Sequence, residues 1–232
     1  VTQIIADELQ VIKREFGDAR RSEIVVNGVD LSMEDLIAPE DVVVTLSHTG
    51  YVKSQKLDEY GAQKRGGRGK QATTTKDDDF IEQLFIANTH DYVLCFSNKG
   101  KVYWIKVYEV PLGSRASRGK PIVNLLKMED DERINAILPV REFVEDRYVF
   151  FATRQGVVKK TPLSDFSRPR SVGIWAIELD EGDRLVDVAL TDGSRDVLLF
   201  ASNGKAVRFA EAEVRAMGRT ARGVRGITLT EE

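Results

Sequence analysis

The sequence predicts an all-β domain of repeated, propeller-like blades, preceded by one short helix. From Asp41 onward, short runs of strand-forming residues alternate with turns that contain glycine, a pattern typical of β-hairpins rather than βαβ units. The pattern returns about every fifty residues, which is the period of a propeller-type blade. Before Asp41, apolar residues instead follow a helical spacing.

The composition is that of a globular chain. Of the 232 residues, 42% are hydrophobic and 31% are charged, which suits one large all-β domain or two smaller ones. No apolar run approaches a membrane span and no signal-peptide pattern is present, so we expect a soluble, cytoplasmic protein. The lone Cys95 lies in an apolar run, which predicts a buried structural thiol. With only His48 and His90 in addition, we expect no metal site.

The first forty residues predict a helix and a polar connector. Apolar residues recur at helical spacing from Val1 to Phe16, and Gly17 follows as a stop signal. Ser32 and Asp35 are spaced as in a capping box, which predicts a short helical turn that ends before Pro39.

The region after Asp41 contains four copies of one unit. Each copy has an apolar strand, a turn with glycine and a second strand with a cation in it, such as Lys53 or Lys159. The turn glycines of the four copies are Gly50, Gly100, Gly156 and Gly204.

A second landmark repeats with the same period: a loop that contains cations and ends on glycine. The four glycines are Gly69, Gly119, Gly173 and Gly223. We name the loops the first to fourth basic loops. The cations of the second are Arg115, Arg118 and Lys120, those of the third are Arg168 and Arg170, and those of the fourth are Arg219, Arg222 and Arg225. Because a radial repeat places equivalent loops at equivalent radius, these loops predict a curved basic track. The alternative is that the glycines mark tight hairpins and the cations keep sheet edges soluble.

The first basic loop has the densest charge. It holds four cations and three glycines in eight residues: Gln63, Lys64, Arg65, Gly66, Gly67, Arg68, Gly69 and Lys70. Glycines let the main chain approach a partner, and the cations suit phosphate oxygens, so the loop is a candidate clamp for a polyanion. A solvated basic turn is the alternative. The net charge of −3 does not exclude phosphate binding, which depends on the local potential within a Debye length of about 8 Å.

Residues 63–69 resemble the gyrase A box, the basic heptapeptide Gln-(Arg/Lys)-Arg-Gly-Gly-(Lys/Arg)-Gly that marks the C-terminal domain of the DNA gyrase A subunit. The similarity extends to residues 40–48, 87–91 and 118–126 and covers essentially the whole chain. It implies a β-pinwheel of four-stranded blades, six in the complete family domain and about four here, that wraps duplex DNA around its perimeter. Lys64, Arg65, Arg68 and Lys70 would fasten the wrapped end, and the later cations would guide its path.

The resemblance also implies a domain organisation. Residues 1–22 would end the helix of the DNA-cleavage region, residues 23–40 would form a connector, and residues 41–232 would form the wrapping domain, truncated at its C-terminus.

By the same resemblance, the chain is part of the A subunit of an ATP-dependent type II topoisomerase. It would act on double-stranded DNA in the bacterial nucleoid, within an A2B2 complex that holds the gyrase B subunit besides the rest of the A subunit. ATP and Mg²⁺ would act through the B subunit, whereas no cofactor is expected in this fragment. The glycine-rich run does not fit a nucleotide phosphate loop, which would need glycine at position 64 and a hydroxyl at position 71. The tyrosine nucleophile of the family lies upstream, so no catalytic residue is assigned.

Two rival interpretations stay open. One is the related domain of topoisomerase IV, which bends DNA without strong wrapping and has lost or degraded the box. The other is a propeller used for protein contacts, with incidental basic loops. Salt dependence separates these, because phosphate binding weakens steeply with salt and an apolar interface does not.

Overall fold

The structure is a computed structural model that describes residues 1–19, 21–22, 32–60 and 79–229. It divides into two compact units, Val1–Leu36 and Ile37–Glu232, which are described separately.

The first unit contains the expected helix and the expected capped turn. Helix α1 (Thr2–Phe16) is followed by Gly17, whose N–H donates to the Lys13 carbonyl. Among the described residues, none of the α1 side chains is buried. The short 3₁₀ helix η1 (Glu34–Leu36) has the predicted capping box. The Asp35 N–H donates to Ser32 Oγ, and the Ser32 N–H donates to the Asp35 carboxylate at 2.8 Å.

The second unit is built from antiparallel sheets, which confirms the predicted all-β class. Three sheets have four strands and a fourth has two within the described residues; we call them blades 1 to 4. Blade 1 has the order β3-β1-β2-β6, comprising β3 (Ile81–Asn88), β1 (Asp41–Ser47), β2 (Tyr51–Lys56) and β6 (Lys120–Pro121). Blade 2 is β7 (Ile134–Val140), β4 (Tyr92–Ser97), β5 (Lys101–Lys106) and β10 (Ile174–Trp175). Blade 3 is β11 (Leu185–Thr191), β8 (Tyr148–Thr153), β9 (Val157–Pro162) and β14 (Val224–Arg225). Blade 4 is β12 (Asp196–Phe200) and β13 (Ala206–Ala210).

Each blade is centred on one hairpin with the predicted glycine turn. The four turn glycines, Gly50, Gly100, Gly156 and Gly204, all have φ between 80° and 85°. This left-handed conformation strains residues that carry a Cβ, which explains why glycine recurs there. Five further 3₁₀ helices lie beside the strands: η2 (Leu57–Tyr60), η3 (Val107–Glu109), η4 (Ile122–Asn124), η5 (Leu163–Phe166) and η6 (Glu211–Glu213).

The outermost strand of each four-stranded blade comes from the following repeat. Strand β6 lies beyond Gly119 in the second repeat, yet it pairs with β2 of blade 1, with Val52 opposite Lys120. In the same way β10 pairs with β5, and β14 pairs with β9. The periodicity of the sequence did not predict this exchange. Its physical effect is that the open edges of β2, β5 and β9 receive hydrogen-bonding partners.

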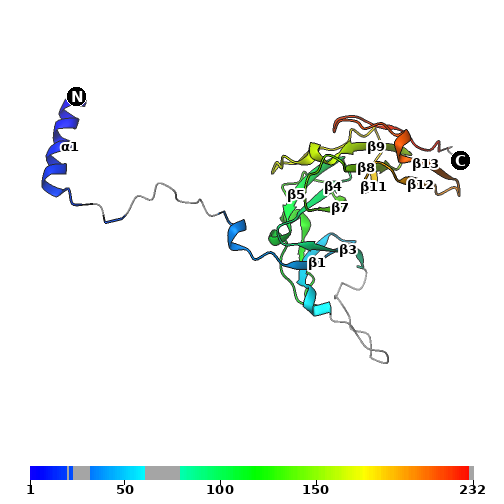
Figure 1. Cartoon of the computed structure of the whole chain (residues 1–232), viewed down its shortest axis with the longest axis horizontal. Coiled ribbons are helices and arrows are strands. Elements are labelled where there is room, and N and C mark those ends of the chain that lie inside the picture. The colour runs from blue at the N-terminus through cyan, green and yellow to red at the C-terminus, as the bar shows by residue number, and fades with distance from the viewer. Residues whose placement is uncertain (20, 23–31, 61–78, 230–232) are drawn as a thin grey trace. The chain divides into compact units, whose positions relative to one another are not determined.

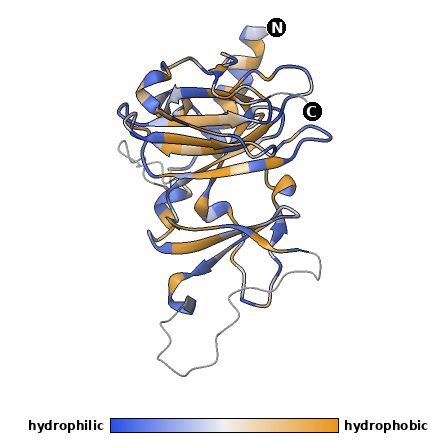
Figure 2. Cartoon of the chain, turned by 90° about the vertical axis from the view of Figure 1, so that its right-hand side faces the viewer, coloured by the Kyte–Doolittle hydropathy of each residue, from blue (hydrophilic) through white to orange (hydrophobic). Residues whose placement is uncertain are grey.

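The opposite edge of each sheet faces its neighbours. Strand β7 of blade 2 contacts both β3 and β11, and the blades follow one another in chain order through the second unit (Figure 1). One apolar cluster joins blades 1 and 2 and another joins blades 2 and 3. Hydrophobic residues accordingly run along the strands in Figure 2. Cys95 is fully buried as expected, and burial raises the pKa of its thiol to about 12.

Candidate nucleic-acid interface

The first basic loop lies outside the residues that the structure describes. This applies to all eight of its candidate residues: Gln63, Lys64, Arg65, Gly66, Gly67, Arg68, Gly69 and Lys70. Their assignment to DNA binding stays a prediction.

The second basic loop runs along the outer edge of blade 1. Arg118 and Lys120 are exposed, and Lys120 lies in the exchanged strand β6. Arg115 is partly exposed, with its Nε atom 3.9 Å from Oε2 of Glu59. Gly119 has a φ of 83°, and a Cβ there would meet the Val52 carbonyl oxygen at 2.3 Å. The loop therefore lies directly on β2, where only glycine fits.

The third basic loop runs along the outer edge of blade 2. Arg168 and Arg170 are both exposed and follow η5. The Gly173 N–H donates to the Arg170 carbonyl, which closes the turn before β10. A Cβ at Gly173 would meet the ring of Tyr103 on β5 at 2.6 Å. Within the described residues, neither arginine forms an ion pair, so both guanidinium groups face solvent.

The fourth basic loop runs along the outer edge of blade 3 and is held differently. Arg225 is exposed on β14, whereas Arg219 is partly buried. Arg222 is already engaged: its guanidinium donates to Asp180 at 2.9 Å and to Glu178 at 3.2 Å. A phosphate would have to displace these carboxylates, so Arg222 is a weaker candidate than the sequence suggested.

Three turns rich in acidic residues, which we call the acidic turns and which include Asp79, Asp130 and Asp183, each contact a hairpin turn. The Thr49 N–H donates to Asp79 at 3.0 Å, and the Gln155 N–H donates to Asp183 at 3.0 Å. In the second repeat, Lys99 Nζ donates to the Asp130 carbonyl at 2.9 Å. Each acid precedes β3, β7 or β11, the strands at the edge opposite the basic loops. The two signs of charge are therefore separated only in part, because Asp180 of the third acidic turn pairs with Arg222 of the fourth basic loop.

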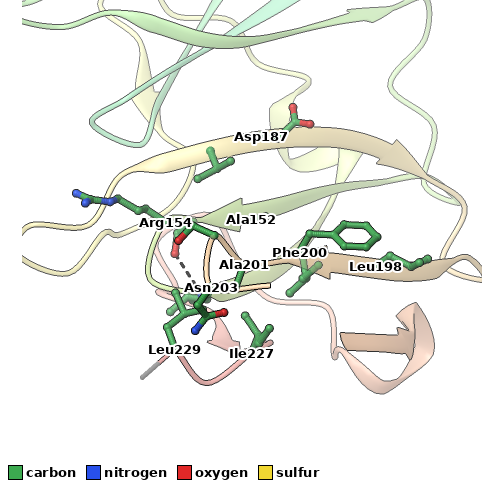
Figure 3. A pocket seen from close by; sticks show the side chains of 15 residues that line it. Ala152, Arg154, Asp187, Leu198, Phe200, Ala201, Asn203, Ile227 and Leu229 are labelled. Atoms are coloured by element: carbon green, nitrogen blue, oxygen red, sulfur yellow. Dashed lines mark hydrogen bonds between the residues drawn. The ribbon is translucent and has the colours of Figure 1, made fainter. Parts of the chain in front are cut away.

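One pocket is lined by none of the candidate cations of the basic loops. It has a volume of about 700 Å³ and lies between blade 3 and the hairpin of blade 4 (Figure 3). Leu198, Phe200 and Ile227 line it together with one labelled cation, Arg154. Among the described residues, no cluster of His, Cys, Asp and Glu could hold a metal ion, and no helix is long and apolar enough to cross a membrane.

Comparison with known proteins decides the family. A family model described as "DNA gyrase C-terminal domain, beta-propeller" matches residues 41–88, 91–141, 147–192 and 195–232, one segment for each repeat. The chain belongs to the DNA gyrase C-terminal domain family. The DNA gyrase A subunit of Salmonella typhimurium is 59% identical over 227 residues, which cover 98% of this chain and 26% of that protein. The Escherichia coli K12 protein of the same name is 58% identical over 217 residues, covering 94% and 25%. The chain therefore spans about a quarter of the length of these relatives.

Two solved structures resemble this gyrase C-terminal domain. The C-terminal domain of DNA topoisomerase IV aligns with a TM-score of 0.72 and 36% identity, covering 84% of this chain and 59% of that one. The DNA gyrase A C-terminal domain aligns with a TM-score of 0.65 and 29% identity, covering 83% and 62%. Both likenesses confirm the predicted pinwheel class.

The burial of two lysines was not predicted. The sequence pattern places a cation in the second strand of the repeat, but Lys53 and Lys159 are 2% and 0% exposed. Burial lowers the pKa of Lys53 and lowers that of Lys159 to about 8, although Asp165 acts on Lys159 in the opposite direction. The sequence shows only that the two lysines are equivalent, since each directly follows an apolar residue, Val52 or Val158, in its strand; it carries no signal of their burial.

The lowered pKa of Lys159 gives a pH prediction. Between pH 8 and the ordinary lysine pKa of 10.5, the unfolded chain binds this proton and the folded chain does not. Stability contributed by Lys159 is therefore expected to rise with pH across that window. The measurement is urea denaturation of the native chain and of Lys159→Met at pH 7.5 and pH 10. The difference in unfolding free energy between the two proteins removes the contributions of the titrating groups that they share. A difference in unfolding free energy that stays constant between the two pH values would contradict the expectation.

Proposed function

We propose that this domain binds duplex DNA along the outer edges of its blades and wraps it, without reading base sequence. The observation that carries the proposal is the strand exchange, which puts the second, third and fourth basic loops on the outer edges of blades 1, 2 and 3. Lysine and arginine on glycine-rich loops bind phosphates and carry no code for base edges. Bending a 20–30 base-pair site costs of order 1–6 kcal/mol, which counterion release by many dispersed cations can offset.

Within DNA gyrase, wrapping would present a neighbouring DNA segment to the cleavage gate. The domain would then act as part of the A subunit, together with the B subunit, in an A2B2 complex that carries out ATP-dependent negative supercoiling. The catalytic tyrosine, ATP and Mg²⁺ would belong to other parts of that complex. Lys64, Arg65, Arg68 and Lys70 of the first basic loop would fasten the end of the wrap.

The test has two measurements. One is the Kd for duplex DNA as a function of salt concentration, and the other is the change in linking number of relaxed circular DNA after the domain is bound and topoisomerase I is added. Arg118→Ala with Arg170→Ala is expected to lower the slope of log Kd against log salt by about 2, since each phosphate contact contributes about 0.9. Changing Lys64, Arg65 and Arg68 to alanine should leave DNA bound but reduce the change in linking number.

The matched control removes two exposed arginines that lie outside the basic loops. Arg141 is 3.5 Å from Asp91 and Arg195 is 3.0 Å from Asp192, and replacing both with alanine changes the net charge equally. We expect native slope and native linking number from this control. An equal loss in the control and the loop variant would show that only net charge matters and would contradict the proposed track.

A second candidate function is DNA bending without strong wrapping. It is favoured by the higher TM-score with the topoisomerase IV domain. The full box in the first basic loop argues for wrapping instead. Steep salt dependence without any change in linking number would select bending.

A further inference from the structure

Two lysines occupy the same unusual place in the repeat. Lys53 follows Val52 on β2, and Lys159 follows Val158 on β9, and each is almost entirely buried. Fully buried lysine is rare because an ammonium loses its hydration there, unless other groups replace the water. Within the described part of the chain, neither lysine forms an ion pair with a carboxylate. Their partners are backbone carbonyls instead.

All three carbonyls bound by Lys53 belong to the second basic loop. Its Nζ atom donates to the carbonyls of Ser117 at 2.8 Å, Ser114 at 3.1 Å and Arg115 at 3.4 Å. An ammonium has three N–H donors, so this loop accounts for all of them. The loop comes from the following repeat, so Lys53 of blade 1 binds an exchanged segment and not its own repeat.

Lys159 binds two exchanged segments at once. Its Nζ atom donates to the carbonyl of Arg219 in the fourth basic loop, and to that of Ala176 at 2.6 Å. Ala176 directly follows β10, the strand that the third basic loop delivers to blade 2. The same two segments meet again where the Glu178 N–H donates to the Ala221 carbonyl and Arg222 pairs with Glu178 and Asp180. Lys159 therefore lies at the junction between the third and fourth loops.

The hydrogen bonds of the buried ammonium favour the loop bound on its blade over the detached loop. If a loop left its blade, the carbonyls would leave with it and the buried ammonium would lose its hydrogen bonds. Hydrogen bonds to charged groups are stronger than those between neutral groups, and a buried charge without partners is strongly destabilising. Because the lysines bind the loops through backbone carbonyls, this contact does not itself occupy the loop side chains.

We propose that Lys53 and Lys159 are positioning residues for the DNA-binding loops. Each ammonium fixes an exchanged basic loop on the outer edge of its blade, and Lys159 also fixes two neighbouring loops relative to each other. The role in DNA binding rests on the function proposed above, whereas the holding of the loops does not require DNA.

Blade 2 offers an internal comparison, because its equivalent residue is Tyr103. The Tyr103 hydroxyl donates to Glu132 at 2.6 Å, and Glu132 lies in the acidic turn of the same repeat rather than in a basic loop. The third basic loop packs on the Tyr103 ring through Gly173 without an equivalent ammonium. Its outer part should therefore open more readily than the second and fourth loops.

The first test is amide hydrogen exchange of the 232-residue chain without DNA. Lys53→Met should speed exchange at residues 114–121 about tenfold or more, and Lys159→Met should do so at residues 216–226. Exchange in β8 and β11 should stay native. The matched control is Lys160→Met: Lys160 is adjacent and 6% exposed, but its Nζ atom donates to the Glu211 carbonyl in η6. It should leave residues 216–226 protected.

The second test is the salt dependence of DNA affinity of the same variants. Lys159→Met should lower the slope of log Kd against log salt by about 1–2, although a buried Lys159 cannot touch a phosphate itself. General destabilisation reduces the folded fraction and leaves that slope unchanged. If one variant fails to fold, the other still reports on its own loop.

The outcomes separate the two proposals. Native protection in the loops, or exchange that rises equally in β8 and β11, would overturn the positioning role. A native slope in a variant whose loop has opened would overturn it as well. If the unaltered chain binds no DNA, the proposed function is wrong, and hydrogen exchange alone still decides whether the lysines hold the loops.

Discussion

Replacing Phe151 with alanine is expected to lower the free energy of unfolding by about 3–5 kcal/mol. The ring is 0% exposed and lies between blades 2 and 3. It meets Phe96 edge to face, with ring centroids 5.5 Å apart, and packs against Phe166 of η5. Its removal leaves a cavity in the interface and also takes away the ring that lies 5.5 Å from Lys159 Nζ.

Urea denaturation measures this effect, and Phe200→Ala is the matched control. Phe200 is 77% exposed, so its removal should change the free energy of unfolding by less than about 0.5 kcal/mol. Equal losses in the two variants would mean that blades 2 and 3 do not share the apolar cluster described above.

Gly119→Ala is expected to release the second basic loop from blade 1, at a cost of about 3 kcal/mol or more. The left-handed φ of 83° alone costs roughly 1–2 kcal/mol for a residue with a Cβ. The new Cβ would also meet the Val52 carbonyl oxygen at 2.3 Å and Lys53 Cβ at 3.0 Å, which breaks the contact between the loop and β2. Urea denaturation and hydrogen exchange at residues 114–121 measure the two effects.

Gly182→Ala is the control that separates the backbone strain from the clash with β2. Gly182 has a φ of 75°, and among the described residues no atom lies within 4 Å of an added Cβ. This control should show only the backbone strain of about 1–2 kcal/mol. If Gly119→Ala costs no more than Gly182→Ala, the loop does not depend on its close contact with β2.

Local patterns in the sequence were enough to predict the hairpins. Gly50, Gly100, Gly156 and Gly204 each occupy a turn that requires left-handed backbone, and this requirement acts within one repeat. The capping box of Ser32 and Asp35 was equally local. Glycine turns and capping boxes depend only on residues close together in the chain, so they can be predicted from the sequence.

The origin of the outer strands could not be predicted in the same way. Contacts between repeats decide whether Lys120 pairs with its own hairpin or with Val52 of the preceding one. The periodicity of the sequence gives no information about these contacts. The burial of Lys53 was hidden for a related reason. In an alternating strand, a lysine after Val52 indicates a solvent-facing position, but β2 is covered on both sides because the exchanged loop closes over it. The sequence therefore predicted which residues are candidates for the site, but not which residues of other repeats they contact.

Strand exchange also bears on how the chain matures during synthesis. Blade 1 cannot close its outer edge until the ribosome has released β6, which lies beyond the whole hairpin of the second repeat. Blades 1, 2 and 3 can thus complete their outer edges only after the following repeat has been synthesised, and those edges stay open meanwhile. For the same reason, the boundaries of the sequence repeat do not coincide with those of the four-stranded sheets. A duplicated repeat would complete the blade before it and start a new blade that needs a donor in turn.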